Sequence, residues 1–336
     1  MKVVVLNLST HDALFAPVRA VPGVQVVHAR YQTSWEEVSA RRRGAPTEPE
    51  VLGDDLRATL AEAEIVVGFA VPRALPSLAP HLKWVASIAT GMDHLRGSGV
   101  LEADILLTNV GATFAPVLAE HVFAAMLYLA KRLPELTAQQ RAHTWKMAQV
   151  GVLDGKTMGL VGIGRIGSAV ATRAKAFGMS TIGLGRSPAV GRVVAGVDRI
   201  VERHALPALL EASDYVVLAL ADTTETQQLI GAPELATMQA HTVLVNVGRG
   251  SAIDQSALAA ALQAGKLGGA ALDVFAEEPL VATSPLWDLP NVLITPHVAA
   301  YADEYVPRAV RHFTANLSRF LRGEPLVDLF DRTRGY

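Results

Sequence analysis

Short apolar runs, rich in β-branched residues, alternate with helical patterns along the whole chain. Most of these runs are apolar without interruption, as expected for parallel strands that helices cover on both faces. Ten runs are too many for one compact sheet, so the pattern predicts an α/β fold with two doubly wound parallel sheets. The runs cover residues 3–8, 65–69, 84–88, 105–108, 158–161, 181–184, 215–220, 243–246, 270–274 and 292–294.

Length and composition limit the class of protein. The chain has 336 residues, of which 50% are hydrophobic and 18% are charged. This predicts two domains with sizeable cores and excludes a disordered protein. The chain contains no cysteine, so disulfides, thiolate nucleophiles and cysteine-based metal sites are excluded, and we expect no metal site.

Charge and hydropathy predict a soluble cytoplasmic protein that binds neither nucleic acid nor membrane. The formal net charge is −2, and the one basic run, residues 41–43, lies beside Gly44 and Pro46. We interpret this run as a solvated loop, with a phosphate-binding patch as the alternative. Residues 1–8 are too short for the apolar core of a signal peptide, and the apolar stretch 117–130 is too short for a membrane span.

A glycine-rich turn follows the predicted strand 158–161. Its sequence, GIGRIG at 162–167, has the G-x-G-x-x-G spacing and precedes an amphipathic helical pattern. Gly162 permits the tight turn, Gly164 lets the backbone approach a pyrophosphate, and Gly167 lets the helix pack on the strand. The helix N-terminus then faces the phosphate charge. The strand–turn–helix context therefore predicts a dinucleotide site, against the alternative of a purely structural turn.

The residues after the next predicted strand, 181–184, predict which dinucleotide binds. NAD enzymes commonly place a carboxylate there to accept a hydrogen bond from the ribose 2′-hydroxyl. This chain instead has Gly185, Arg186 and Ser187, and a guanidinium can hold a 2′-phosphate with two hydrogen bonds. We therefore expect NADP(H) to be preferred over NAD(H). The alternative is that Arg186 faces solvent in a turn with Pro188.

Three side chains suited to acid–base chemistry follow successive predicted strands. Arg249 lies between two glycines after the strand 243–246, where it could bind a carboxylate. Glu278 follows the strand 270–274, and His297 follows the strand 292–294. Histidine exchanges a proton near neutral pH, and a carboxylate bonded to it stabilises the imidazolium and sets its tautomer. We expect these three residues to meet where the strands end.

Several motifs resemble those of the D-isomer-specific 2-hydroxyacid dehydrogenase family. The resemblance covers nearly the whole chain and is weakest in residues 9–60. It is carried by LDGKTMGLVGIGRIG, NVGRGSAIDQSAL, ALDVFAEEPL and SPLWDLPNVLITPH, and upstream by KWVASIATGMDHL and TNVGATFAPVLAEHV. It implies a Rossmann nucleotide-binding domain, residues 110–295, inserted into a flavodoxin-like substrate domain made of residues 1–109 and 296–336.

The resemblance also implies roles for individual residues. Arg249 would bind and polarise the substrate, His297 would be the acid/base, and Glu278 would pair with His297. The substrate carboxylate would bind to the backbone amides of Thr90, Gly91 and Met92 in the other domain. The residues expected to contact the dinucleotide are Gly162, Gly164, Arg165, Ile166, Gly167, Arg186, Ser187, Val247 and, at the nicotinamide carboxamide, Asp273.

The predicted activity is hydride transfer between NADPH and C2 of a small 2-oxo or 2-hydroxy acid. The residues 185–186 resemble those of the NADPH-preferring glyoxylate/hydroxypyruvate reductase branch. The alternatives are an NAD-linked dehydrogenase of the phosphoglycerate or D-lactate type, and a non-catalytic dinucleotide-sensing protein.

Oligomeric state is a separate expectation. Pro116 is predicted to open a helix that runs to about Lys131 and is apolar on nearly every face. Such a helix is expected to lie in a core or at a contact between subunits. With the family resemblance, it predicts a homodimer in which Trp145 lies near the subunit contact. A buried structural tryptophan explains Trp145 equally well.

Overall fold

The computed structural model describes residues 1–47, 50–185 and 193–335, and the chain divides into two compact units. The first comprises Met1–Thr113 and Asp303–Tyr336, and the second Phe114–Ala302. Each unit is built on one sheet in which all strand pairs are parallel. This confirms the predicted α/β class and the two sheets.

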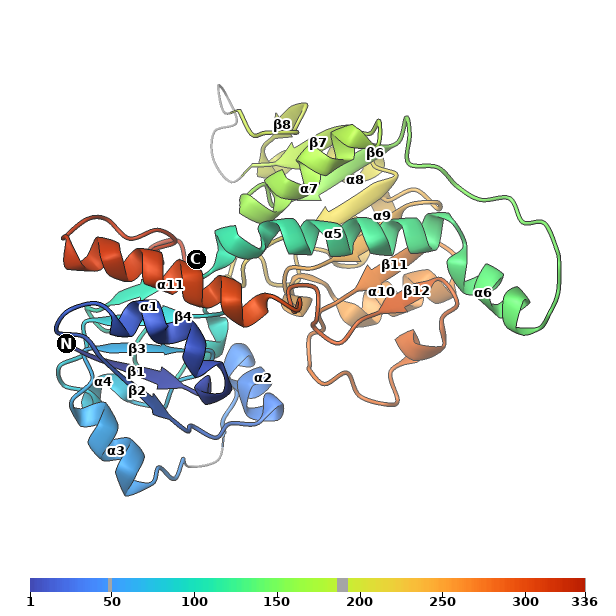
Figure 1. Cartoon of the computed structure of the whole chain (residues 1–336). Helices are drawn as coiled ribbons and strands as arrows, with labels where there is room; N and C mark the ends of the chain where they lie inside the picture. Colours follow the sequence, from blue (N-terminus) through green and yellow to red (C-terminus); the bar gives the residue numbers. More distant parts are fainter. Residues whose placement is uncertain (48–49, 186–192, 336) are drawn as a thin grey trace. The chain divides into compact units, whose positions relative to one another are not determined.

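The sheet of the first unit has five strands in the order β2-β1-β3-β4-β5 (Figure 1). This order is that of flavodoxin-like doubly wound folds. Its central strands are fully buried, because helices lie on both of its faces. The strands are β1 (Lys2–Leu6), β2 (Gln25–Ala29), β3 (Ile65–Gly68), β4 (Trp84–Ser87) and β5 (Leu106–Thr108).

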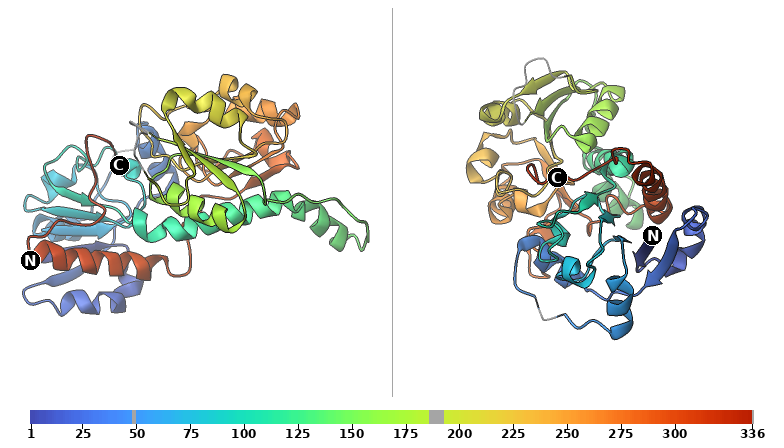
Figure 2. Two further views of the ribbon diagram at one scale, coloured as in Figure 1. Left: turned by 90° about the horizontal axis from the view of Figure 1, so that it is seen from above. Right: turned by 90° about the vertical axis from the view of Figure 1, so that its left-hand side faces the viewer.

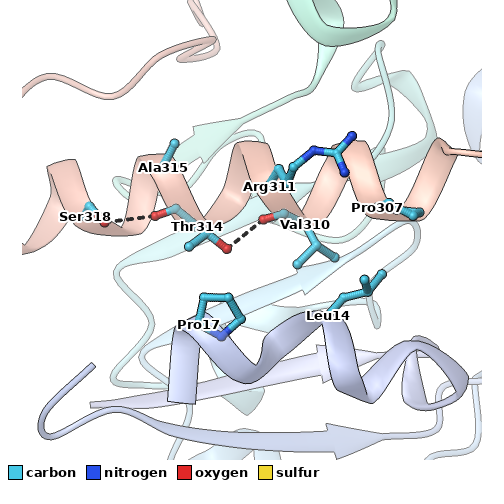
Figure 3. A pocket seen from close by; sticks show the side chains of 8 residues that line it. All are labelled: Leu14, Pro17, Pro307, Val310, Arg311, Thr314, Ala315 and Ser318. Atoms are coloured by element: carbon cyan, nitrogen blue, oxygen red, sulfur yellow. Dashed lines mark hydrogen bonds between the residues drawn. The ribbon is translucent and has the colours of Figure 1, made fainter. Parts of the chain in front are cut away.

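Helices of the first unit bury apolar side chains against this sheet. Its largest helix, α11 (Tyr305–Leu321), buries Phe313 and Leu317. A groove of about 340 Å³ runs between α11 and the segment Leu14–Pro17, as Figure 3 shows. The other helical segments are η1 (Ser9–Phe15), α1 (Ala16–Arg19), α2 (Trp35–Arg43), α3 (Asp54–Ala61), α4 (Leu75–Leu78) and η2 (Asp93–Leu95).

The sheet of the second unit has seven strands in the order β12-β11-β10-β9-β6-β7-β8. The strand order reverses between β6 and β9, which is where open parallel sheets bind ligands, outside the carboxyl ends of the strands. The strands are β6 (Thr157–Val161), β7 (Ser180–Leu184), β8 (Arg199–Val201), β9 (Tyr215–Leu218), β10 (Val243–Asn246), β11 (Gly269–Leu272) and β12 (Val292–Ile294).

The long apolar helix α5 (Gly111–Ala130) begins earlier than the sequence predicted. Pro116 does not open it but lies inside it, after its first turn. By length and composition α5 could cross a membrane, but 44% of its apolar window is buried inside the protein. The remaining helical segments of the second unit are α6 (Leu133–Arg141), α7 (Arg165–Ala176), η3 (Arg203–Ala205), α8 (Leu206–Glu211), α9 (Ala232–Thr237), η4 (Gly250–Ala252), α10 (Gln255–Gln263) and η5 (Pro285–Asp288).

Helix α6 and the segment that follows it extend away from the sheet of the second unit (Figures 1 and 2). No residue of α6 is buried, and residues 144–150 form no helix or strand. Two large apolar side chains in this segment are almost fully exposed, Trp145 at 99% and Met147 at 92%. The interpretation of Trp145 as a buried structural residue is therefore wrong.

The interpretation of the basic run 41–43 as a solvated loop is wrong. It forms the last turn of α2, which ends where Gly44 adopts a left-handed conformation with φ of +67°. Arg41 is only 4% exposed. Its guanidinium donates hydrogen bonds to the Val71 carbonyl, the Tyr31 hydroxyl and the Glu37 carboxylate, at 2.7, 2.7 and 2.6 Å. Burial raises the pKa of Tyr31, so its phenol stays protonated.

We predict that Arg41→Ala lowers the free energy of unfolding by about 3 kcal/mol, because it leaves buried acceptors without their donor. Urea-induced unfolding measures this change. The matched control is Arg30→Ala, because Arg30 belongs to the same unit and is exposed. The control should change stability by no more than about 0.5 kcal/mol. Equal effects of the two substitutions would contradict the buried role of Arg41.

Candidate active site

The carboxyl ends of four strands in the second unit carry the residues singled out from the sequence. Strand β6 leads into the glycine turn, and β10 leads into Arg249. Strand β11 leads into Asp273 and Glu278, and β12 into His297. Because all these strands are parallel, these loops lie at one edge of the sheet.

The glycine turn between β6 and α7 has the geometry that a bound pyrophosphate requires. Gly162 has φ of +104°, and a Cβ there would lie 2.6 Å from the Ala219 carbonyl oxygen. A Cβ at Gly167 would collide with the Gly162 carbonyl, so the helix packs directly on the turn. Over Gly164, by contrast, no atom of the described residues lies within 4 Å of such an atom. The twelve-residue helix α7 begins after Gly164, which has no side chain to cap the first amides, and such amides can bind an anion.

Of the other predicted dinucleotide contacts, some belong to the described residues and two do not. Arg165 and Ile166 form the first turn of α7, and Val247 follows β10 and is buried, with its amide bonded to the Leu218 carbonyl at 3.2 Å. Arg186 and Ser187, on which the prediction of NADP(H) preference depends, lie outside the described residues.

Arg249 is presented by a loop held by Asn246. The fully buried Asn246 side chain accepts a hydrogen bond from the Gly248 amide and donates one to the Arg249 carbonyl, at 3.0 and 2.9 Å. The Arg249 side chain is half-buried, and one of its guanidinium nitrogens donates to the Gly248 carbonyl. Next to it, Gly250 packs so closely on the backbone at Phe275 that no side chain fits. The loop that carries Arg249 is thereby packed against the loop that carries Glu278.

Glu278 and His297 form a direct pair. The His297 Nδ1 atom lies 2.9 Å from Glu278 Oε2 and 3.1 Å from Oε1. Glu278 is only 8% exposed, and its Oε1 also accepts a hydrogen bond from the Phe275 amide. The bond from Nδ1 to the carboxylate sets the orientation and the tautomer of the imidazole ring. The structure thus brings together two of the residues that sequence reasoning grouped, and places Arg249 on the adjoining loop.

Asp273 bonds to the segment that carries His297. Its Oδ1 accepts hydrogen bonds from the Thr295 hydroxyl at 2.6 Å and from the Val298 amide at 2.9 Å. Its Oδ2 accepts one from the Ala299 amide at 3.0 Å. The Asp273 carboxylate, which is 3% exposed, therefore fixes the turn around His297, in addition to the role at the nicotinamide that the family resemblance implies.

Sequence reasoning did not single out two further residues of this network, Thr295 and His121. His121 lies on α5, and its Nε2 is 3.2 Å from the Thr295 hydroxyl and 3.9 Å from Asp273 Oδ1. The only signal for His121 in the sequence was the polar pair of Glu120 and His121 within the apolar stretch 117–130. Among the described residues, no group of three His, Asp or Glu side chains is arranged to hold a metal ion.

The predicted carboxylate-binding segment belongs to the first unit. Thr90, Gly91 and Met92 form the loop between β4 and η2. The start of this loop is tied down by the Tyr305 hydroxyl, which donates to the Ile88 carbonyl at 2.5 Å. After the loop, the buried His94 bonds through Nε2 to the Phe69 carbonyl, and the two rings stack with centroids 4.7 Å apart.

Comparison with known proteins gives consistent matches. Residues 123–299 match the sequence model described as D-isomer specific 2-hydroxyacid dehydrogenase, NAD binding domain. A glyoxylate reductase from Thermococcus litoralis is 33% identical over 319 residues, which are 91% of this chain and 93% of that protein. Glyoxylate/hydroxypyruvate reductase B from Pectobacterium carotovorum is 37% identical over 257 residues, 73% of this chain and 78% of that protein.

A solved structure is similar over the whole length of the chain. It is the NADPH-dependent glyoxylate/hydroxypyruvate reductase from Sinorhizobium meliloti, in complex with NADP and sulfate. The TM-score is 0.80 and the sequence identity 30%, and the match covers 100% of this chain and 99% of that one.

Proposed function

The chain belongs to the D-isomer specific 2-hydroxyacid dehydrogenase family, and on that premise we propose that it reduces a small 2-oxo acid, such as glyoxylate or hydroxypyruvate, with NADPH. The observation that carries the proposal is the Glu278–His297 pair, with Nδ1 and carboxylate 2.9 Å apart, beside the loop of Arg249. This arrangement supplies an acid, a group that stabilises its charged form, and a cation. A 2-oxo acid requires these three groups for reduction at C2.

Each residue has one role in the proposed reaction. When bound, NADPH supplies the hydride that forms the new C–H bond at C2 of the substrate. His297 donates the proton from Nε2 to the C2 oxygen, so the carbonyl becomes a hydroxyl. Glu278 stabilises the imidazolium through Nδ1 before the transfer. Arg249 stabilises the negative charge that grows on the oxygen. In the oxidative direction the same groups act in reverse.

The cofactor part of the proposal depends on both geometry and sequence. The open space over Gly164 and the uncapped N-terminus of α7 suit a pyrophosphate. We assign the 2′-phosphate of NADPH to Arg186 and Ser187 because a guanidinium and a hydroxyl favour a phosphate there and a carboxylate is missing from Gly185–Ser187. The relative from Sinorhizobium meliloti, whose structure contains NADP, supports this choice. As in the sequence analysis, the amides of Thr90, Gly91 and Met92 are assigned to the substrate carboxylate.

We also propose that the protein is a soluble cytoplasmic homodimer. The exposed segment after α6 supports the homodimer, because Trp145 and Met147 would otherwise leave a large apolar surface in water. A second copy of the chain is the proposed partner of this segment.

We expect steady-state reduction of glyoxylate and hydroxypyruvate with NADPH, at a kcat/KM that exceeds the value with NADH at least tenfold. Arg186→Ala should raise the KM for NADPH about tenfold or more, because a charge-assisted hydrogen bond is lost, and leave the KM for NADH unchanged. A preference for NADH would contradict the assignment of Arg186 but not the hydride transfer. Absence of turnover with any 2-oxo acid would contradict the proposed function.

His297→Gln should lower kcat by roughly 10²- to 10⁴-fold, because the proton donor of the reaction is removed. The dissociation constant of NADPH, measured by fluorescence titration, should stay nearly the same. The matched control is His81→Gln, since His81 is exposed and lies in the first unit, just before β4 and at the opposite end of that strand from the Thr90 loop. If kcat of the His297 variant equals that of the control, His297 is not the acid/base.

Sedimentation equilibrium should give twice the 35.7 kDa chain mass at micromolar concentration. Replacing Trp145 and Met147 together by serine should shift the equilibrium towards the monomer, because apolar contact area is lost. Val51→Ser is the control, since Val51 is 94% exposed and belongs to the first unit. A monomer mass for the unaltered chain would contradict the homodimer.

A further inference from the structure

We propose that Thr295 and His121 are positioning residues that, through Asp273, hold His297 in its reactive orientation. The inference deepens the proposed function and rests on it, since it presumes that His297 is the acid/base. Neither residue needs to touch substrate. Each acts through hydrogen bonds on the turn that presents the imidazole.

The turn at His297 needs such support. His297 has φ of +55°, a left-handed conformation that is uncommon for non-glycine residues and costs free energy. Its amide donates to the Asp273 carbonyl at 2.8 Å, and to the Thr295 carbonyl at 3.0 Å. The amides of the next two residues, Val298 and Ala299, donate to the two carboxylate oxygens of Asp273. Asp273 therefore bonds to three consecutive amides, and a shift of its carboxylate would release the turn.

The directions of the hydrogen bonds follow from the number of protons available. The Thr295 hydroxyl has one proton, which it donates to Asp273 Oδ1 at 2.6 Å. At 3.2 Å from His121 Nε2 it must then act as the acceptor, so that nitrogen carries a proton. The network thus runs from His121 to Thr295 to Asp273, and every member is part of the described second unit.

His121 connects this network to a rigid element. It lies in the middle of the 20-residue helix α5, whereas Thr295 follows β12, 174 residues later. Its side chain is 22% exposed and approaches Asp273 Oδ1 to 3.9 Å. The neighbouring Glu120 instead pairs with Arg173, at 3.8 Å. The His121 imidazole is thus the group through which α5 holds the buried carboxylate.

The experiment compares Thr295→Val with Thr295→Ser. Valine keeps the shape and loses the hydroxyl, whereas serine keeps the hydroxyl. Two readouts are needed: steady-state kinetics with glyoxylate and NADPH, and amide hydrogen exchange of residues 295–300 in the protein without cofactor. In the valine variant we expect kcat to fall about tenfold with little change in KM, because a misplaced acid affects the transition state more than binding. We expect its amides to exchange faster, and the serine variant to recover both values.

A matched control separates positioning from general loss of stability. Thr242 is fully buried in the same unit, and its hydroxyl donates to the Ser213 carbonyl at 2.8 Å. Thr242→Val should lower the melting temperature without changing kcat or the exchange of residues 295–300.

A second pair of variants tests the other end of the network. His121→Met loses the donor, whereas His121→Gln places an amide donor near the position of Nε2. The glutamine variant should have the higher kcat of the two.

The outcomes distinguish this inference from the proposed function. If Thr295→Val has the kcat and exchange rates of the unaltered chain, or if valine and serine are equally impaired, the positioning role is wrong. If His297→Gln retains full turnover, the proposed acid/base is wrong, and the positioning role fails with it. Loss of turnover in His297→Gln, together with recovery by serine at position 295, supports both.

Discussion

Parallel strand pairing is the constraint on which the site depends. In a sheet whose strands all run the same way, every loop that follows a strand emerges at the same edge. In the second unit this brings the glycine turn, the Arg249 loop, Asp273 with Glu278, and His297 to one edge, although they span more than 130 residues of sequence. Close packing then links neighbouring loops, as where Gly250 meets the backbone at Phe275.

The same constraint explains which strands could be predicted from the sequence. Strands with neighbours on both sides are buried on both faces and appear as unbroken apolar runs, as in β3 and β10. Two strands were missed, β2 and β8, and both lie at a sheet edge. They contain exposed or half-buried residues throughout, including Gln25 and Arg199, so no apolar run marks them. The burial of Arg41 was missed for another reason. Its partners Tyr31 and Val71 are 10 and 30 residues away, so no local pattern in the sequence indicates them.

Within the site, sequence reasoning could name residues that follow a strand but not the residues that hold them. Glu278 and His297 were paired because each follows a strand and their chemistry is complementary, and they lie 2.9 Å apart. The bonds of Asp273 to Thr295, Val298 and Ala299 leave no pattern in a single sequence. His121 comes from a helix, where a polar residue has many possible partners. Hydrogen bonds across long sequence separations become visible only in the folded chain.

The left-handed backbone at His297 has a consequence for the evolution and engineering of such a protein. A residue with a Cβ gives up roughly 1–2 kcal/mol in that conformation, whereas glycine does not. Glycine at this position would therefore relax the backbone while removing the proposed acid/base. Selection for thermal stability alone would act against the histidine, and selection for turnover would retain it. At position 297 the stability of the backbone and the proposed activity therefore favour different residues.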